Sequence, residues 1–315
     1  MSPMKTEISE DWTYQGFRVV RLEAGDLRVD VLPELGGKIL SIYHAGIRRE
    51  FLWRNPRLRL RRVPIGTSYD DHFFGGLDDN IPNDQPERFC GENLVDHGEL
   101  WTLPLSSRIE GKALVLEGDL PITPIRYRRR VEIEPPETIR LDYRLQNIGG
   151  RQLKFLWKLH PALRISEGAQ VEVPARKAEV AEPAWSRFGG SSGTLEFPWP
   201  NGTDAYGKPL RADLVPALDG RSTEFLCLSD LERGEAGLVH PKEGWAFRMR
   251  FPAEILRSVW LFASYRGWRE HGVLVLEPST NWPVGLAEAS TRGQSCRLGP
   301  GEVLIASIQV TAGKA

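Results

Sequence analysis

Two ionisable side chains close apolar runs of the sequence, each directly in front of a proline. His160 follows the apolar part of FLWKLHPAL (155–163), and Glu277 follows that of VLVLEPST (273–280). Because a following proline pushes a residue into the extended region, fewer directions are open to each side chain. Apolar surroundings raise the pKa of a carboxyl group and lower the pKa of an imidazole, and both shifts move the groups toward values useful for proton transfer near neutrality. Groups poised in this way suit proton transfer to and from a substrate.

The same local pattern occurs twice more, so it does not identify a site by itself. His240 precedes proline in GLVHPKEG, and Glu134 precedes proline in VEIEPPE. A further histidine, His97, lies in NLVDHGELW (93–101) beside a glycine, which lets the backbone turn sharply or approach a ligand closely. Each of these residues also has a purely structural interpretation, as the end of a strand or as a loop side chain with its own hydrogen bonds.

Several established signatures of chemistry are missing from the sequence. It contains no P-loop, no glycine-rich dinucleotide fingerprint, no GxSxG elbow and no HExxH motif. The six histidines never occur at a metal-binding helical spacing, and the three cysteines are too scattered for a disulfide framework or a zinc cluster. The loop HFFGGLDDNIPND (72–84) suits calcium or a sugar hydroxyl, but it lacks the spacing of a calcium loop.

The composition is that of an ordinary globular protein. Of 315 residues, 41% are hydrophobic, and 41 Lys plus Arg nearly balance 42 Asp plus Glu. This balance gives no electrostatic reason to expect nucleic acid or an anionic membrane as a partner. The basic stretches RLRLRRVP (57–64) and RYRRR (126–130) are interpreted as arginines on the solvent face of strands, with phosphate binding as the alternative. Scattered cysteines, a polar N-terminus and the lack of a membrane-length apolar window predict a soluble, cytoplasmic protein.

The elements that carry the candidate side chains are predicted to be strands. Apolar and polar residues alternate over 125–133 and 139–145, which we interpret as a hairpin. Strand-like segments recur about every ten residues between frequent glycines and prolines, a spacing typical of a sandwich or barrel. One short helix is predicted within 281–290. The weakly periodic stretch 166–222 is either a linker or, given its aromatic residues, an excursion packed on the same body, and we predict a single all-β domain over 1–315.

Five widely separated pieces of the sequence occur in an order known from one superfamily. They are LPELGGKILSI (32–42), GGLDDNIPND (75–84), DHGELW (96–101), FLWKLHPAL (155–163) and LVLEPSTNWP (274–283). Together they resemble the galactose mutarotase-like superfamily, that is, the aldose 1-epimerases and their relatives. The likeness extends from about residue 12 to 311 and implies a large β-supersandwich with an open sugar-binding face and few short helices.

The resemblance implies a reaction and a role for three of the candidates. A base takes the proton of the anomeric hydroxyl of a cyclic aldose while an acid protonates the ring oxygen, and reclosure after rotation gives the other anomer. By resemblance Glu277 is the base, His160 is the acid, and His97 hydrogen-bonds the substrate near the ring oxygen. We therefore expect these three side chains to converge on one cleft wide enough for a hexose, while His240 and Glu134 lie elsewhere.

The sequence departs from galactose-type members in the residues that would select a sugar. Those members carry a longer stretch with asparagine and phenylalanine after the acid histidine, where this chain has Pro161-Ala162-Leu163. Their arginine and aspartate that read sugar hydroxyls have no clear counterpart, and Asp79 and Asp230 are the acidic candidates for this role. The identity of the sugar therefore stays open.

Three functions are compatible with the sequence. The first is a mutarotase acting on a hexose or a modified sugar, without a metal or organic cofactor. The second is a non-catalytic carbohydrate-binding protein on the same fold, because fold does not fix function. The third is a sugar-phosphate mutarotase in which Arg54, Arg57 or Arg126 clamps the phosphate. In each case the expected partner is a small-molecule sugar, and the expected state is a monomer or a homodimer.

Overall fold

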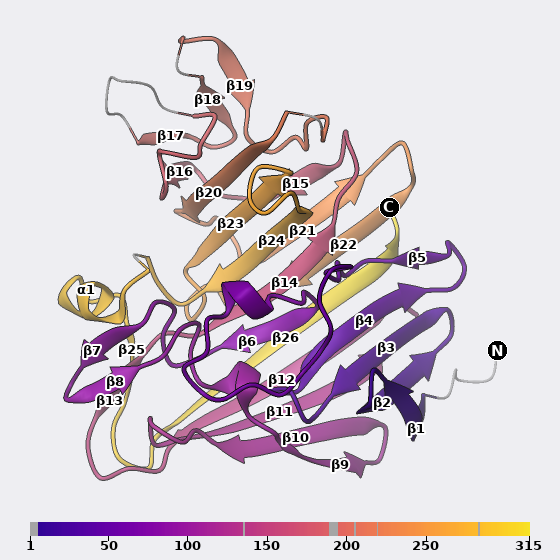
Figure 1. The fold of residues 1–315 in the computed structure, drawn as a ribbon, viewed down its shortest axis with the longest axis vertical. Coiled ribbons are helices and arrows are strands. Elements are labelled where there is room, and N and C mark those ends of the chain that lie inside the picture. The colour runs from indigo at the N-terminus through magenta and orange to yellow at the C-terminus, as the bar shows by residue number, and fades with distance from the viewer. Residues whose placement is uncertain (1–5, 135, 189–194, 205, 219, 283) are drawn as a thin grey trace.

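Two large antiparallel β-sheets form the body of the protein in the computed structural model, which describes residues 6–134, 136–188, 195–204, 206–218, 220–282 and 284–315. Figure 1 shows the strands of both sheets running diagonally across the molecule, with few helical turns. The prediction of an all-β fold is confirmed.

The first sheet has twelve strands, and its central strands carry the candidate residues. In spatial order the strands are β1 (Glu7–Tyr14), β2 (Phe17–Ala24), β3 (Leu27–Leu32), β4 (Lys38–His44), β6 (Leu77–Asn80), β14 (Lys158–Arg164), β24 (Gly272–Ser279), β23 (Ser258–Tyr265), β20 (Ser222–Ser229), β16 (Lys177–Val180) and β17 (Glu196–Pro198), with β5 (Arg49–Glu50) beside β4. Residues far apart in the sequence therefore become neighbours at the centre of one sheet.

The second sheet has eight strands and packs against the first. Its order is β15 (Gln170–Glu172), β21 (Glu235–His240), β22 (Trp245–Arg250), β26 (Val303–Lys314), β12 (Thr138–Asn147), β11 (Ile125–Glu134), β10 (Ala113–Asp119) and β9 (Ser106–Glu110). Three two-stranded pairs complete the strands of the described residues: β13 (Leu153–Phe155) with β25 (Cys296–Leu298), β18 (Asn201–Thr203) with β19 (Pro209–Arg211), and β7 (Glu87–Phe89) with β8 (Glu92–Leu94).

Helical structure is short in the part of the chain that the structure describes. The helix predicted within 281–290 is present as α1 (Leu286–Thr291), which begins after the first residues of that segment. Single 3₁₀ turns occur at η1 (Asp70–His72) and η2 (Leu100–Thr102). Within the described ranges no helix is long and apolar enough to cross a membrane.

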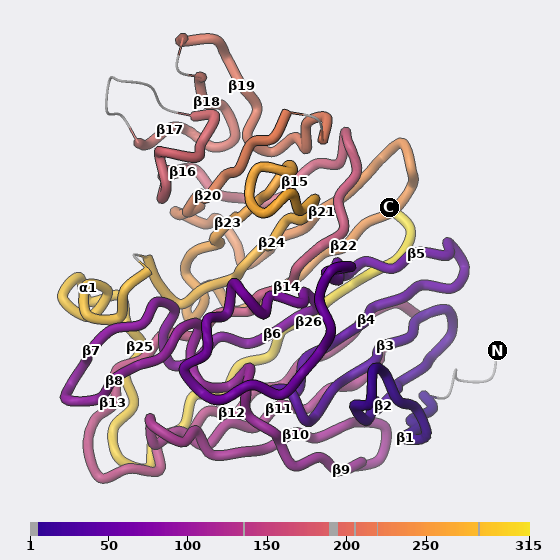
Figure 2. The backbone as a smooth tube through the Cα atoms, in the orientation of Figure 1, coloured from indigo at the N-terminus to yellow at the C-terminus, as the bar shows by residue number. Residues whose placement is uncertain are grey.

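The stretch 166–222 supplies strands to both large sheets. β15 lies at the edge of the eight-stranded sheet, while β16 and β17 extend the twelve-stranded sheet. The tube in Figure 2 shows β17, β18 and β19 gathered at the upper end of the view. These strands agree with an excursion packed on the sheets rather than with a linker.

The predicted hairpin is confirmed, but one of its arginines lies on the unexpected face. β11 and β12 pair antiparallel, with Ile133 opposite Ile139. Because side chains alternate along a strand, Arg129 points inward between Tyr127 and Val131 and is fully buried. The interpretation of RYRRR as solvent-facing arginines is therefore wrong for Arg129, whose charge needs a partner inside the core.

Both faces of the central strands in the twelve-stranded sheet are buried. On β24, Leu274 and Leu276 join the large core cluster between the sheets. Val273 and Val275 point to the other face, where they pack in a separate cluster with Tyr69 and other residues of the connection between β5 and β6. The outer face of the sheet is thus covered by connecting segments, which supply the second wall of the site described next.

Candidate active site

The register of two neighbouring strands brings His160 and Glu277 together. β14 and β24 pair antiparallel with Ala162 opposite Val275, so that two residues away on each strand His160 comes to lie across from Glu277. Their side chains point to the outer face of the sheet, and His160 Nε2 lies 3.9 Å from Glu277 Oε2. The two pre-proline residues are therefore parts of one site.

A cavity of about 410 Å³ opens over this pair. Its ionisable and polar lining residues are Tyr69, Asp70, Asp84, Gln85, His97, Lys158, His160, Glu182 and Glu277, and its aromatic lining residues are Phe73, Trp185, Phe225, Phe262 and Trp268. This cavity, called the sugar cavity below in view of its proposed ligand, contains all three residues for which convergence was expected. It lies within the size range of small-ligand pockets.

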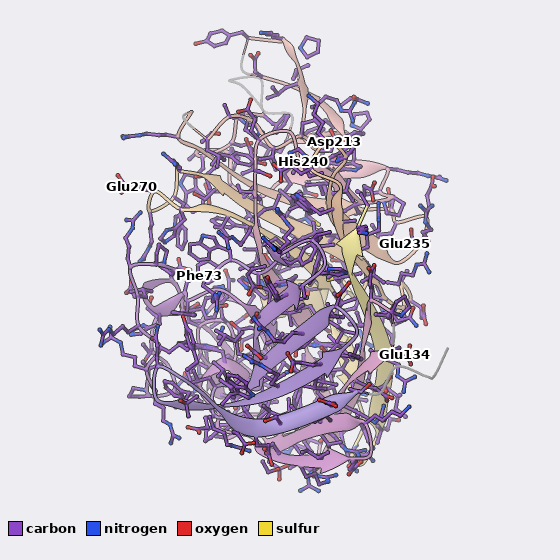
Figure 3. The ribbon with its side chains drawn as sticks, turned by 90° about the vertical axis from the view of Figure 1, so that its right-hand side faces the viewer. Phe73, Glu134, Asp213, Glu235, His240 and Glu270 are labelled. Atoms are coloured by element: carbon purple, nitrogen blue, oxygen red, sulfur yellow. The ribbon has the colours of Figure 1, made fainter. Side chains whose placement is uncertain are left out.

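The two residues that share the local pattern lie elsewhere. His240 Nε2 is 3.0 Å from the carbonyl oxygen of Glu167, and Glu134 pairs with Arg140 on the eight-stranded sheet. Figure 3 shows Glu134 on the flank of the molecule opposite Phe73, which lines the sugar cavity. The environment, and not the local sequence, distinguishes His160 and Glu277.

His160 is held by Tyr69, whose hydroxyl lies 3.2 Å from its Nδ1. Burial, reinforced by Asp78, raises the pKa of Tyr69 well above its ordinary value, so the phenol keeps its proton. That proton is donated to Asp78 Oδ2 over 2.9 Å. The phenol oxygen then accepts from Nδ1–H of His160, and we infer that the Nε2 atom faces the cavity and Glu277.

The acidity of His160 is set by its surroundings. Burial, followed by the charge of Lys158, lowers the pKa of His160 well below its ordinary value. A proton placed on this imidazole is therefore readily given up. The imidazolium form of His160 is thus a stronger acid than an ordinary histidine, while the neutral form is favoured at neutral pH.

Glu277 is buried and bound to a lysine. Burial raises the pKa of Glu277, and the adjacent ammonium group of Lys158 opposes that rise. Lys158 Nζ lies 2.6 Å from Glu277 Oε2 and 2.5 Å from Asp84 Oδ1. Burial alone would lower the pKa of Lys158, but Asp84 and Glu277 outweigh it and the net shift is upward. One permanent cation therefore bridges two carboxylates at the base of the cavity.

His97 stands beside this pair on a loop. Its ring stacks on Tyr69 with centroids 4.1 Å apart, and its Nδ1 lies 2.8 Å from Asp96 Oδ1. Burial lowers the pKa of His97, but the charges of Asp84 and Asp96 outweigh that effect and the net shift is upward. The Nε2 atom of His97 is thus the nitrogen that remains for a ligand.

The loop that carries His97 requires glycine at position 98. Gly98 has φ +76°, and a Cβ atom added there would lie 2.2 Å from the carbonyl oxygen of Ile81. The same carbonyl accepts the N–H of Glu99 at 2.8 Å, which fixes the loop against the chain after β6. Gly98 therefore permits a close approach between two backbone segments rather than an approach to a ligand.

Asp79 does not line the sugar cavity. It lies on β6 opposite Leu159, and because side chains alternate, it points into the core while Asp78 points to the site. Its carboxylate is fully occupied by core donors: Arg129 Nη1 at 2.7 Å, Tyr127 OH at 2.8 Å, Trp157 Nε1 at 3.1 Å and Tyr143 OH at 3.4 Å. Asp79 is therefore the partner of the buried Arg129 and is not assigned to sugar recognition.

Asp230 also lies outside the sugar cavity. It is exposed in the turn that follows β20, with φ +55°. Its charge acts on Lys177 of β16 and on no lining residue of the cavity among the described interactions. We therefore assign it no role in the site.

Sequence reasoning missed three side chains that complete the site. Lys158 was detectable, because it lies two positions before His160 and must share its face of a strand. Asp84 lies in the aspartate-rich loop that suggested calcium or a sugar hydroxyl, and here it binds Lys158. Tyr69 had no sequence signal, since its position depends on how the connection between β5 and β6 covers the sheet. Among the described residues no group of three or more His, Cys, Asp or Glu side chains could hold a metal ion.

The arrangement is suited to moving protons between two oxygens on one carbon. His160 Nε2 and Glu277 Oε2 are neighbours, with no room for a ring between them. A substrate must therefore lie over both groups, with two adjacent polar atoms reaching one group each. The hydroxyl and ring oxygens at an anomeric carbon are such a pair.

Solved structures share this architecture at low sequence identity. A protein from Synechocystis sp. PCC 6803 superposes with a TM-score of 0.70 at 16% identity, covering 98% of this chain and 100% of that chain. A candidate aldose 1-epimerase from Escherichia coli K12 gives 0.68 at 15% identity, covering 98% and 100%. A galactose mutarotase-like protein from Clostridium acetobutylicum gives 0.69 at 11% identity, covering 100% of both chains.

The fold is therefore shared with galactose mutarotase-like proteins of solved structure, and this is the fold that the sequence resemblance implied. No family model and no curated protein matches the sequence. At these identities the comparisons establish the fold, and the chemistry rests on the site.

Proposed function

We propose that the protein is an aldose 1-epimerase-like isomerase that interconverts the α and β anomers of a sugar. The observation that carries the proposal is the placement of His160 and Glu277, 3.9 Å apart, in the wall of the sugar cavity with His97 beside them. The fold shared with candidate aldose 1-epimerases supports the same class of reaction.

In the proposed reaction, Glu277 and His160 each transfer one proton. Glu277 takes the proton of the anomeric hydroxyl while His160 donates a proton to the ring oxygen, and the bond between the anomeric carbon and the ring oxygen breaks. The open aldehyde rotates about the bond next to its carbonyl carbon. As the ring closes on the other face, His160 takes back the proton of the hydroxyl that attacks, and Glu277 returns its proton to the carbonyl oxygen. Because the pKa of Glu277 is raised, its carboxylate is a stronger base than an ordinary glutamate. Because the pKa of His160 is lowered, its imidazolium form is a stronger acid than an ordinary histidine.

The charge of the sugar cavity favours a sugar without phosphate. Its lining contains the carboxyl groups of Asp70, Asp84, Glu182 and Glu277, against the single ammonium group of Lys158. Because like charges repel in a poorly solvated site, an anionic group would be disfavoured there.

The arginines suggested for a phosphate clamp do not line the cavity. Arg54 pairs with Glu50, and Arg126 forms a two-pronged contact with Asp119 on the exposed face of the second sheet. Arg57 lines a different cavity. An uncharged hexose or a related uncharged aldose is therefore the substrate class that we propose.

Aromatic side chains give the cavity a surface on which a sugar ring can stack. Trp185 lines the cavity and is 49% exposed, so part of its side chain is open to a ligand. Trp268 packs edge-on against Phe73 and Phe262 in the same lining. Tryptophan combines a flat apolar face with a polar N–H, which suits the apolar face and hydroxyl edge of a sugar.

Anomer exchange measured by NMR tests the proposal. Pure anomers of several uncharged hexoses and of hexose phosphates are dissolved with and without the protein, and binding of each sugar is measured in parallel. We expect faster exchange for at least one uncharged hexose. Saturable sugar binding without faster exchange would instead favour the non-catalytic carbohydrate-binding alternative. Faster exchange restricted to hexose phosphates would contradict the proposed substrate class.

A further inference from the structure

A second cavity next to the candidate active site is lined by arginines. It has a volume of about 720 Å³, and its charged lining residues are Arg57, Arg164, Arg221, Arg266 and Glu270. We call this cavity the arginine hollow. Four guanidinium groups thus meet one carboxylate in a protein whose formal net charge is −1, so the positive charge is local and does not reflect a basic protein.

Most of these arginines have no acidic partner in the described part of the chain. The side chains of Arg164, Arg221 and Arg266 form no ion pair with a described carboxylate within 4 Å. Arg57 reaches Glu270 at 3.4 Å, with both side chains more than half exposed, so this pair is weak. The hollow therefore keeps several guanidinium groups available to an anion.

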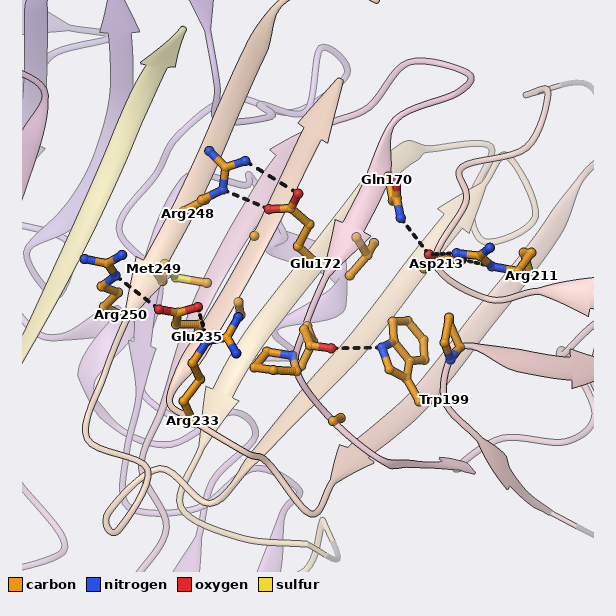
Figure 4. A pocket seen from close by; sticks show the side chains of 17 residues that line it. Gln170, Glu172, Trp199, Arg211, Asp213, Arg233, Glu235, Arg248, Met249 and Arg250 are labelled. Atoms are coloured by element: carbon orange, nitrogen blue, oxygen red, sulfur yellow. Dashed lines mark hydrogen bonds and ion pairs between the residues drawn. The ribbon is translucent and has the colours of Figure 1, made fainter. Parts of the chain in front are cut away.

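Another arginine-lined cavity of the same protein shows what a satisfied cluster looks like. A cavity of about 600 Å³ at the edge of the eight-stranded sheet also contains four arginines (Figure 4). Their pairs are Arg211 with Asp213, Arg233 and Arg250 with Glu235, and Arg248 with Glu172. A carboxylate thus pairs with every arginine there, whereas in the arginine hollow Arg57 alone has such a partner among the described residues.

We propose that the arginine hollow binds a phosphate group carried by a small molecule or present as the free ion. The planar guanidinium fork matches the oxygens of phosphate and binds them in pairs. The excess of three positive charges in the lining favours a multiply charged anion such as phosphate over a single carboxylate. The volume also leaves space for an organic part of a phosphate ester against Trp53, which lines the hollow.

An aromatic wall separates the arginine hollow from the sugar cavity. Trp53 of the hollow stacks on Phe73 of the sugar cavity, with ring centroids 5.4 Å apart. His271 fills the space between Trp53 and Trp268, with centroid distances of 4.9 and 5.3 Å. Figure 3 shows Glu270 of the hollow and Phe73 on the same flank of the molecule. The hollow is thus a separate site adjacent to the first.

The backbone offers substitutions that remove charge without adding strain. Arg221 and Arg266 have φ values of +47° and +64°, a region that glycine adopts more easily than arginine. Arg221→Gly with Arg266→Gly is therefore expected to fold. Arg48 is a matched control, because it is exposed, has φ +49° and does not line the hollow.

Titration calorimetry at low ionic strength tests the proposal with inorganic phosphate, pyrophosphate and glucose 6-phosphate as probes. We expect saturable binding to the wild type, at least tenfold weaker binding to the double variant, and unchanged binding to Arg48→Gly. Excess uncharged hexose should not displace the probes.

The relative affinities of the probes identify the ligand, and three results would overturn the proposal. Tighter binding of glucose 6-phosphate than of phosphate would identify an ester as the ligand, and the reverse order would identify the free ion. Absence of saturable binding for all three probes would overturn the proposal. Equal weakening by Arg48→Gly, or displacement by the hexose, would also overturn it, because binding would then be nonspecific or would occur in the sugar cavity.

Discussion

Lys158 is the side chain that connects the acidic groups of the candidate active site. Its ammonium group contacts both Glu277 and Asp84 and lies over the ring of Trp260 at 4.3 Å. Without it, two buried carboxylates would face each other with no cation between them, and one would be expected to take up a proton. Lys158 therefore keeps Glu277 in the form that can accept a proton from a substrate.

We predict that Lys158→Met moves the pH–rate profile of anomer exchange to higher pH. Lys158 lowers the pKa of both Glu277 and His160, so its removal raises both. The acidic limb, which reports ionisation of the base, and the basic limb, which reports loss of the proton from the acid, should both move upward. Initial rates between pH 5 and 9 measure the shift.

Lys158→Arg is the control for this prediction, because it keeps the charge and should give a profile close to that of the wild type. Breaking the buried pair should also lower stability by about 3–5 kcal/mol, so circular dichroism must first show that Lys158→Met is folded at the assay temperature. A profile that stays in place or moves to lower pH in a folded Lys158→Met variant would contradict the role given to this lysine.

Two strands position the proposed acid and base of the site, and a loop positions His97. β14 and β24 fix His160 and Glu277 by register, which leaves little freedom at a central position of a sheet. His97 instead depends on a loop whose path requires a glycine in contact with the carbonyl group of Ile81. The loop should therefore be more sensitive to backbone changes than to changes of side-chain polarity.

We predict that Gly98→Ala destabilises the protein and slows anomer exchange. The added methyl group would clash with the carbonyl oxygen of Ile81, at a φ that alanine rarely adopts. Gly111→Ala is the matched control, because Gly111 has φ +63° but no atom within 4 Å of the added Cβ. Thermal unfolding should show a loss at least about 1 kcal/mol larger for Gly98→Ala. Equal losses in the two variants would show that the contact with Ile81 is unimportant.

Periodicity made much of this arrangement predictable from the sequence. Alternation located the hairpin of β11 and β12, and the ordered motifs indicated that His97, His160 and Glu277 belong together. The partners inside the core were not predictable, because Asp79 and Arg129 meet only when two sheets pack and nothing local marks either residue. Tyr69 is similar, since its contact with His160 joins residues 91 positions apart in the sequence.

The two sheets are joined by a polar contact as well as by apolar packing. Asp79 from the first sheet and Arg129 from the second form an ion pair whose side chains are completely buried. The remaining hydrogen-bonding capacity of Asp79 is filled by two tyrosines and a tryptophan of the core. The pair links a residue of one sheet to a residue of the other, and removal of one partner leaves the other charge buried without a counter-charge.

We predict that Asp79→Asn lowers the free energy of unfolding by about 3–5 kcal/mol, because Arg129 would remain buried without a carboxylate. The folded fraction should keep the wild-type KM for its sugar, since Asp79 does not line the sugar cavity. Asp119→Asn is the control, because its partner Arg126 is exposed, and it should change stability little. Denaturant titration gives the stabilities. A raised KM with unchanged stability would mean that Asp79 reads the sugar after all.

The most direct measurement is the rate of anomer exchange by NMR in two matched pairs of variants. Glu277→Gln is compared with Glu134→Gln, and His160→Gln with His240→Gln, because both members of each pair precede proline in the sequence. We expect the Glu277 and His160 variants to lose about 10²- to 10⁴-fold in rate, and the Glu134 and His240 variants to keep the wild-type rate. Wild-type rates in folded Glu277→Gln and His160→Gln proteins would contradict the assignment of the acid and the base.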